Sequence, residues 1–112
     1  VEARLYDTAE GQQILVADRH GELAGLLALD LMYYLPLGAR TCRITALVVS
    51  AKEQRRGVGR MLLREAEQRA RQAGAARIEL TSATHRHEAH EFYRACGFGE
   101  SALRFLKRLG DA

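Results

Sequence analysis

The segment from Gln54 to Arg60, Gln-Arg-Arg-Gly-Val-Gly-Arg, places glycine and arginine where an anion could bind. It follows an apolar run at 44–49 and opens an amphipathic stretch over 58–73. This order predicts a strand, a short turn and a helix start, whose first N–H groups lack partners within the helix. The helix dipole adds positive potential, and glycines at 57 and 59 would let a ligand approach the backbone. We therefore predict a phosphate-binding turn.

Three arginines in this segment, Arg55, Arg56 and Arg60, carry charge that does not titrate near neutral pH. A P-loop is disfavoured because no Gly-Lys-Ser or Gly-Lys-Thr is present. The dinucleotide fingerprint needs a third glycine, and position 62 is Leu62 instead. The chain has 17 Lys and Arg against 14 Asp and Glu, a net charge of +3. This modest excess fits a solvated surface as well as an anionic ligand.

A second segment, residues 89–98, carries an ionisable phenol near the end of an expected helix. Tyr93 lies four residues before Gly97. Taken alone, such a tyrosine is explained by packing, because its ring is apolar and only its tip is polar. Phe92 and Phe98 are assigned to the core. Any chemistry at Tyr93 therefore depends on what the rest of the fold brings to it.

The remaining sequence indicates the elements that position these segments. Expected strands lie at 14–17, 23–34, 42–49, 77–81 and 103–109, and expected helices at 58–73 and 87–96. Turn residues at 18–21 separate the first two strands, and Pro36 and Gly38 end the second. Gly74 and Gly97 are expected to end the helices. The order β, β, β, α, β, α, β predicts an α/β domain with a mixed sheet.

The length of 112 residues and the hydrophobic share of 47% suit one globular domain, residues 1–112. Cys42 and Cys96 match neither a metal-ligand spacing nor a disulfide framework, which favours reduced thiols and a cytoplasmic location. No apolar run approaches the ~18 residues of a membrane span, so no membrane partner is expected. The first residues lack a signal-peptide pattern and an initiator methionine, so we expect an incomplete N-terminus.

Three motifs together resemble the GNAT superfamily of acyl-CoA N-acyltransferases: Leu47-x-Val49, Gln54-x-x-Gly57-x-Gly59 and Tyr93-x-x-x-Gly97-Phe98. The resemblance covers roughly residues 13–109. The motif around Tyr93 is similar to that of small bacterial members of the family. It implies a GNAT-like, mostly antiparallel mixed sheet flanked by helices, and a homodimer by family habit. The family's N-terminal strand and two helices, which form much of the acceptor wall, would be missing or truncated. Residues 1–12 would then hold only the tail of the second helix.

The resemblance also implies an N-acetyltransferase that moves an acetyl group from acetyl-CoA to an amine acceptor by direct attack, without a metal. Tyr93 would be the catalytic general acid that protonates the departing thiolate. The main-chain N–H of Val49 would be a candidate oxyanion donor. The residues expected to bind the coenzyme are Leu47, Val48 and Val49 on the strand, Gln54, Arg55, Arg56, Gly57, Val58, Gly59 and Arg60 in the turn, and Arg86 and Tyr93 on or before the second helix.

The chain departs from the family pattern at several positions. Ala51 replaces a frequent proline and Gln54 a frequent arginine, and neither change prevents phosphate binding by main-chain groups. Arg86 replaces a frequent asparagine, which leaves that side-chain contact open. Arg43 and Thr45 stand where many members have a glutamate or histidine as general base. The alternatives for the base are an ordered water, Glu79, Asp30 or a histidine.

Three other functions stay open from the sequence. His85, His87 and His90 could hold a metal, although no cysteine or carboxylate clearly completes a tetrahedral set. The arginines at 55, 56, 60, 64 and 71 could form a nucleic-acid-binding face, which Glu65 and Glu67 dilute. A non-catalytic acyl-CoA-binding module is the third, because similarity of fold does not establish turnover.

Overall fold

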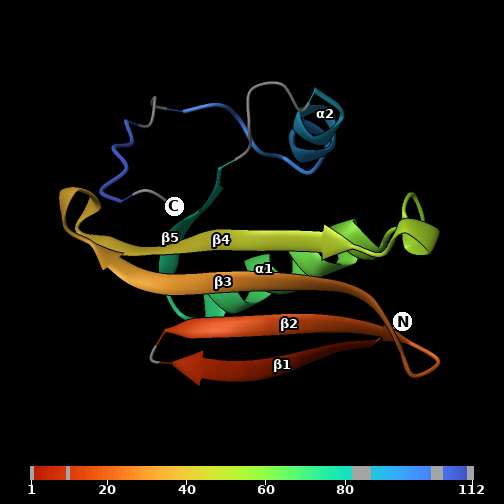
Figure 1. The fold of residues 1–112 in the computed structure, drawn as a ribbon. Coiled ribbons are helices and arrows are strands. Elements are labelled where there is room, and N and C mark those ends of the chain that lie inside the picture. The colour runs from red at the N-terminus through yellow and green to blue at the C-terminus, as the bar shows by residue number, and fades with distance from the viewer. Residues whose placement is uncertain (1, 10, 82–86, 102–104, 111–112) are drawn as a thin grey trace.

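The sheet of this protein is mixed and mostly antiparallel, as the sequence predicts. The computed structural model describes residues 2–9, 11–81, 87–101 and 105–110. Its five strands lie in the order β1-β2-β3-β4-β5, antiparallel except for the parallel pair β4 and β5 (Figure 1). The elements are β1 Glu2–Ala9, β2 Gln12–Arg19, β3 Glu22–Tyr34, β4 Ala39–Val49, α1 Val58–Gln72, β5 Ala75–Leu80 and α2 His87–Ala95, with short 3-10 turns at Leu35–Leu37 and Ala51–Glu53.

The prediction for the N-terminal residues is wrong. Residues 2–9 form strand β1, not the tail of a helix, and pair with β2 from Glu2↔Asp18 onward. Gly11, at φ 80, takes the left-handed conformation that a tight turn needs, and its carbonyl accepts a hydrogen bond from the N–H of Leu31 at 2.7 Å. The hairpin satisfies the main-chain groups on the outer edge of β2, which a helix could not do.

The predicted C-terminal strand is also wrong where the structure describes it. Residues 105–109 lie in no strand, and residues 102–104 are outside the described part. Phe105 and Leu109, at the two ends of this segment, are 93% and 94% exposed. Lys107 and Arg108 interrupt the apolar pattern, and the described segment gains neither a ladder nor a core to bury its apolar side chains.

One face of the sheet packs against α1, which lies behind it in Figure 1. The buried core is apolar and is formed by Leu15, Ala17, Ala24, Leu27, Leu29, Cys42 and Ile44 of the sheet with Val58, Leu62, Leu63, Ala66 and Ala70 of α1. Gly25 permits a close approach, because a Cβ there would lie 2.9 Å from Val58 Cγ1 and 3.0 Å from the Val48 carbonyl oxygen. The apolar stripe of α1 therefore fits directly onto β3.

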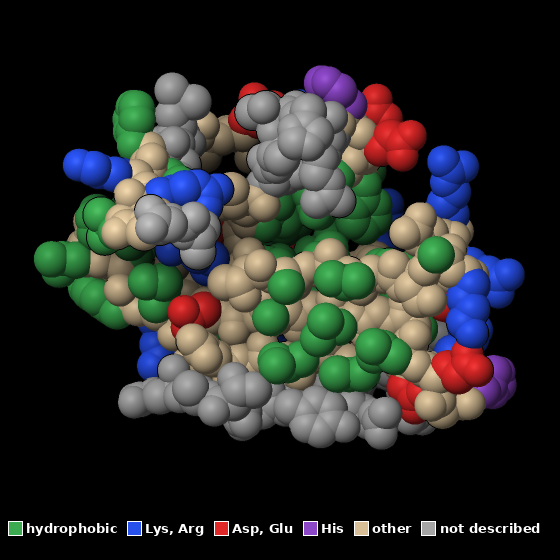
Figure 2. All heavy atoms as spheres, viewed as in Figure 1, with side chains coloured by type: hydrophobic (Ala, Val, Ile, Leu, Met, Phe, Trp, Pro, Cys, Tyr) green, Lys and Arg blue, Asp and Glu red, His purple; other side chains and the backbone are tan. Residues whose placement is uncertain are grey.

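The opposite face carries a group of hydrophobic side chains over β2, β3 and β4 (Figure 2). Val16, Leu26 and Val48 share one register row, and none of them is buried. Because side chains alternate along a strand, these residues point away from α1 while their neighbours Leu15 and Leu27 point toward it. Among the described residues, neither helix is long and apolar enough to cross a membrane.

Candidate functional site

The main chain of β4 extends well beyond its pairing with β5. The parallel ladder runs from Arg40↔Ala75 to Ile44↔Leu80, whereas β4 stays paired with β3 as far as Gly25↔Val49. Over Leu47–Val49, the described residues therefore supply a strand partner on one side only. Main-chain N–H and C=O groups on the other side are available to an extended ligand, which could pair there as an added strand would.

A β-bulge at Thr45 marks the point where β4 and β5 separate. Ala28 pairs with Ala46 and Leu29 with Ile44, so Thr45 is the extra residue of β4. Its hydroxyl donates to the Ala28 carbonyl oxygen at 3.4 Å. A bulge bends its strand and increases the local twist. The sequence carries no clear signal for this bulge, which turns β4 away from β5 immediately after the last ladder pair.

The predicted phosphate-binding turn lies between the end of β4 and the start of α1. Arg55 and Gly57 both have left-handed backbones, with φ of 66 and 84. Alternation of this kind can aim successive N–H groups at one point. Helix α1 has no side-chain cap and no acidic residue in its first turn, and its first helical bond runs from the Met61 N–H to the Gly57 carbonyl at 3.0 Å. The N–H groups of Val58, Gly59 and Arg60, at the start of α1, are therefore suited to an anion.

The two glycines of the turn have different roles. A Cβ on Gly57 would meet nothing within 4 Å, so glycine is required there by its φ of +84. A Cβ on Gly59 would lie 3.2 Å from Phe92 Cζ and 3.6 Å from Val49 Cγ2. Gly59 therefore lets α2 pack against the first turn of α1 beside the end of β4. That both glycines let a ligand approach the backbone stays a prediction, and the packing against Phe92 gives a second reason for glycine at position 59.

Two ion pairs fix the turn to the β2–β3 hairpin. Glu53, 6% exposed, accepts a hydrogen bond from Arg19 Nε at 3.0 Å. Lys52 pairs with Glu22 at the surface, and this ammonium lowers the pKa of the Glu22 carboxyl. The sequence analysis missed Glu53, although a glutamate just before an arginine-rich turn is a signal that could have been used. The shielded Arg19–Glu53 pair holds the segment that leads into the phosphate turn.

Replacing Glu53 with alanine should lower the free energy of unfolding by about 2 kcal/mol, because Arg19 would lose a charged hydrogen bond that is largely shielded from water. Urea denaturation followed by circular dichroism measures this change. Glu22→Ala is the matched control, since it removes a carboxylate from an exposed pair and should leave the free energy of unfolding close to that of the parent protein. Equal losses in the two variants would contradict the anchoring role of Glu53.

Tyr93 is held by the way α2 ends. The Phe98 N–H donates to the Tyr93 carbonyl and the Gly97 N–H to the Arg94 carbonyl, both at 3.0 Å, with Gly97 at φ 94. This is a Schellman motif, in which the residue after the glycine often packs on the helix. The ring of Tyr93 lies 6.1 Å from that of Phe98 and 5.6 Å from that of Phe92. The half-buried Tyr93 ring is therefore fixed in place.

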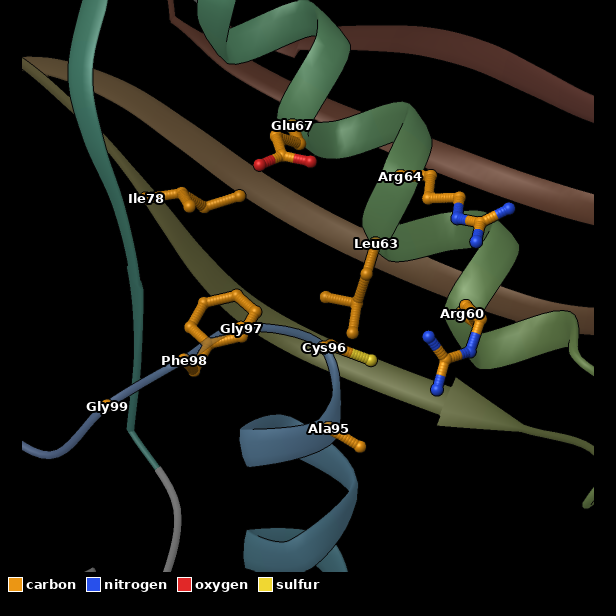
Figure 3. A pocket seen from close by; sticks show the side chains of 10 residues that line it. All are labelled: Arg60, Leu63, Arg64, Glu67, Ile78, Ala95, Cys96, Gly97, Phe98 and Gly99. Atoms are coloured by element: carbon orange, nitrogen blue, oxygen red, sulfur yellow. The ribbon is translucent and has the colours of Figure 1, made fainter.

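A cavity of about 370 Å³ lies between α1, β5 and the end of α2 (Figure 3). Leu63, Ile78 and Phe98 give it apolar walls, and Arg60 and Arg64 stand at one side. Arg60 belongs both to the predicted phosphate turn and to this cavity. An anionic ligand with a flat apolar part would find complementary groups there.

The other predicted binding residues are placed as follows. Gln54, Arg55, Arg56 and Arg60 are exposed, and Val58 is buried in the core. Val48 is 56% exposed on the face away from α1, and its main chain lies on the open edge of β4. Arg86 lies outside the described residues.

Cys42 is fully buried, and burial raises the pKa of its thiol to about 11, with Asp30 and Glu79 adding to the shift. This thiol is therefore protonated at neutral pH and is no nucleophile. Glu79, one of the candidate bases, is engaged by Arg43 at 2.7 Å and by Arg77 at 3.4 Å. Both carboxylate oxygens of Glu79 therefore face guanidinium groups, and Asp30, a histidine and an ordered water remain the other candidates.

Two of the alternative functions can be compared with the geometry. His87 and His90 have ring centroids 6.0 Å apart, and His85 lies outside the described residues. Within the part of the chain that the structure describes, no group of three or more His, Cys, Asp or Glu residues could hold a metal ion. On α1, Arg69 and Arg71 pair with Glu65 and Glu67 at 3.6 and 3.2 Å. These pairs reduce the positive potential that nucleic-acid binding would need.

Comparison with known proteins assigns the family. Residues 2–98 match the family described as the acetyltransferase (GNAT) family. The chain belongs to the GNAT acetyltransferase family. An aminoalkylphosphonate N-acetyltransferase from Salmonella typhimurium strain LT2 is 37% identical to this GNAT chain over 94 residues. That match covers 84% of the chain and 61% of the relative, so the chain spans less than two thirds of that protein.

Solved structures agree with this GNAT fold. A structure described as a transcriptional regulator from Bacillus halodurans has a TM-score of 0.84 at 25% identity, over 90% of this chain and 68% of that one. An aminoglycoside acetyltransferase from an uncultured soil metagenomic sample has a TM-score of 0.82 at 20% identity, over 91% of this chain and 68% of that one. The mostly antiparallel mixed sheet with flanking helices, expected from the sequence motifs, is confirmed.

Proposed function

We propose that this protein transfers an acetyl group from acetyl-CoA to the amine of a small acceptor. The observation that carries the proposal is the continuity between the open edge of β4 and the uncapped start of α1. The open edge of β4 suits the amide-rich pantetheine arm, and the start of α1 suits a pyrophosphate. The two are joined by a turn that is anchored to the sheet through Glu53. A single extended, partly anionic cofactor would use both.

In the proposed reaction the amine nitrogen attacks the thioester carbonyl carbon, and the carbon–sulfur bond then breaks. The main-chain N–H of Val49 would donate to the carbonyl oxygen as negative charge develops on it. Tyr93 would give its phenolic proton to the departing thiolate. The amine would lose its proton to a base, for which Asp30, a histidine and a water are the candidates. No covalent enzyme intermediate is required.

The acceptor is proposed to be a small amine, and the relative at 37% identity gives the first compound class to test. That relative is named for aminoalkylphosphonates, which carry a primary amine and a phosphonate on one short chain. A non-catalytic acyl-CoA-binding module would share the cofactor site and lack turnover. Turnover with any amine therefore separates the two functions.

Calorimetric titration of the protein with acetyl-CoA tests the cofactor assignment. We expect micromolar binding, and weaker binding of dephospho-CoA and of ATP, which lack the 3′-phosphate and the pantetheine arm respectively. Circular dichroism on the same sample establishes that it is folded. A folded sample that takes up no acetyl-CoA would contradict the proposal.

A further inference from the structure

Two arginines and a glutamate form an ion cluster where β4 and β5 are last paired. Arg43 of β4 and Glu79 of β5 are register partners, one pair before the ladder ends at Ile44↔Leu80. Arg43 Nε and Nη2 both lie 2.7 Å from Glu79 Oε1. Arg77 Nη2 lies 3.4 Å from the other oxygen, Glu79 Oε2. One carboxylate is thus shared by two guanidinium groups, and each guanidinium has more N–H donors than these contacts with the described residues use.

The cluster lies on the face of the sheet away from α1. Ile44 is buried against the helix, so its neighbour Arg43 points to the other side. The side chains of Arg43 and Arg77 are 33% and 43% exposed, which leaves both accessible to a small molecule. The Arg77 guanidinium also lies 4.9 Å from the ring centroid of Tyr34, which restricts its motion. Two guanidinium groups are therefore accessible and held in place.

The local charge pattern suits a molecule with charges of both signs. Asp30 of β3 is the register partner of Arg43 on the side opposite Glu79. Two guanidiniums and two carboxylates thus occupy neighbouring positions in three adjacent strands. Guanidinium groups bind phosphonates and carboxylates through paired N–H donors. Asp30 adds a negative charge beside Arg43 on the side away from β5.

The reach to the proposed oxyanion donor, Val49, bears on the length of the acceptor. Arg43 and Val49 pair with Asp30 and Gly25 of β3, which are five positions apart, or about 17 Å of strand at 3.3 Å per residue. An extended arginine side chain and its contact with the anion would span part of that distance. A ligand whose amine and anionic group are separated by two or three carbon atoms would span the remainder.

We propose that Arg43 and Arg77, positioned by Glu79, bind the anionic group of a zwitterionic amine acceptor, with its amine directed toward the opening between β4 and β5. The proposal rests on the acetyltransferase function above and narrows its acceptor to small amines that carry a phosphonate or carboxylate. Arg43 and Arg77 would determine specificity, and Glu79 would position them.

The test compares anionic and uncharged amines in the same assay. Thiol release from saturating acetyl-CoA gives kcat/KM for 2-aminoethylphosphonate and β-alanine, and for ethanolamine and propylamine. We expect the parent protein to prefer the anionic pair by about tenfold or more, as for a charged hydrogen bond. Arg43→Ala should remove this preference mainly through KM, and Arg43→Lys should keep part of it, with the ratio of kcat/KM between anionic and uncharged amines as the readout.

Controls separate this proposal from the assignment of function. Arg71→Ala removes an exposed arginine that is also paired with a glutamate, and it should leave all four substrates unchanged. Calorimetry of the CoA-loaded protein with 2-aminoethylphosphonate gives a second readout, which Arg43→Ala should abolish. Equal rates for anionic and uncharged amines, or preference and binding retained in Arg43→Ala, would overturn the acceptor proposal alone. If the parent protein neither bound acetyl-CoA nor acetylated any of the four amines, the proposed function would be wrong, and this proposal with it.

Discussion

Tyr93→Phe is expected to lower kcat by about 10²- to 10⁴-fold while the dissociation constant of acetyl-CoA stays within about twofold of the parent value, because only general-acid catalysis is removed. Phenylalanine keeps the ring, so the contacts with Phe92 and Phe98 and the Schellman motif at Gly97 remain. Steady-state thiol release measures kcat, and calorimetry measures the affinity for acetyl-CoA.

Tyr33→Phe is the matched control for this variant. Tyr33 is an exposed tyrosine on β3, and loss of its hydroxyl should leave both quantities unchanged. If Tyr93→Phe turned over as fast as the parent protein, another group would protonate the thiolate and the role of Tyr93 would be packing. If the affinity for acetyl-CoA fell together with kcat, Tyr93 would serve in binding.

Gly57→Glu is expected to weaken acetyl-CoA binding by about 10²-fold or more, because it acts in two ways. A residue with a Cβ at φ 84 is strained by about 1–2 kcal/mol, which would distort the turn. The new carboxylate would also compete with phosphate oxygens for the N–H groups at the start of α1. Calorimetric titration with acetyl-CoA measures the loss.

Gly38→Glu controls for the strain alone. Gly38 has φ 68 and, like Gly57, open space around the position of a Cβ, but it lies in the turn before β4, at the end of that strand opposite the start of α1. The Gly38→Glu variant should be less stable than the parent protein and should keep its affinity for acetyl-CoA. Gly57→Ala should give an intermediate affinity. Unchanged binding in Gly57→Glu would remove the phosphate turn from the proposed site.

The sequence predicts the elements with strong local signals. Helix α1 has a regular apolar stripe, and β2 to β4 are separated by turn residues, so their positions agree with the structure to within a few residues. Strand β1 could not be predicted, because residues 2–9 have no regular alternation and pair only once β2 is in place. The C-terminal residues around Phe105 show the reverse case, an apolar pattern that lacks a partner in the described fold.

The site was predictable only where it depends on local conformation. The turn at Gly57 is specified by its glycines and by the strand and helix on either side. The bulge at Thr45 depends on the register between β3 and β4, and the contact of Arg43 with Glu79 joins residues 36 positions apart. Such long-range pairings follow from the whole sheet, and neither a propensity nor a motif reveals them.

The contact between Gly25 and the first turn of α1 has a consequence for the length of the cofactor. A methyl group at Gly25 would meet Val58, Leu62 and the carbonyl of Val48, so it would lift the helix start away from the sheet. The proposed phosphate turn moves with the helix, whereas the open edge of β4 belongs to the sheet. The absence of a side chain at Gly25 therefore sets the distance between the phosphate turn and the open edge of β4. That distance determines how long the arm of an acyl-CoA must be to reach both.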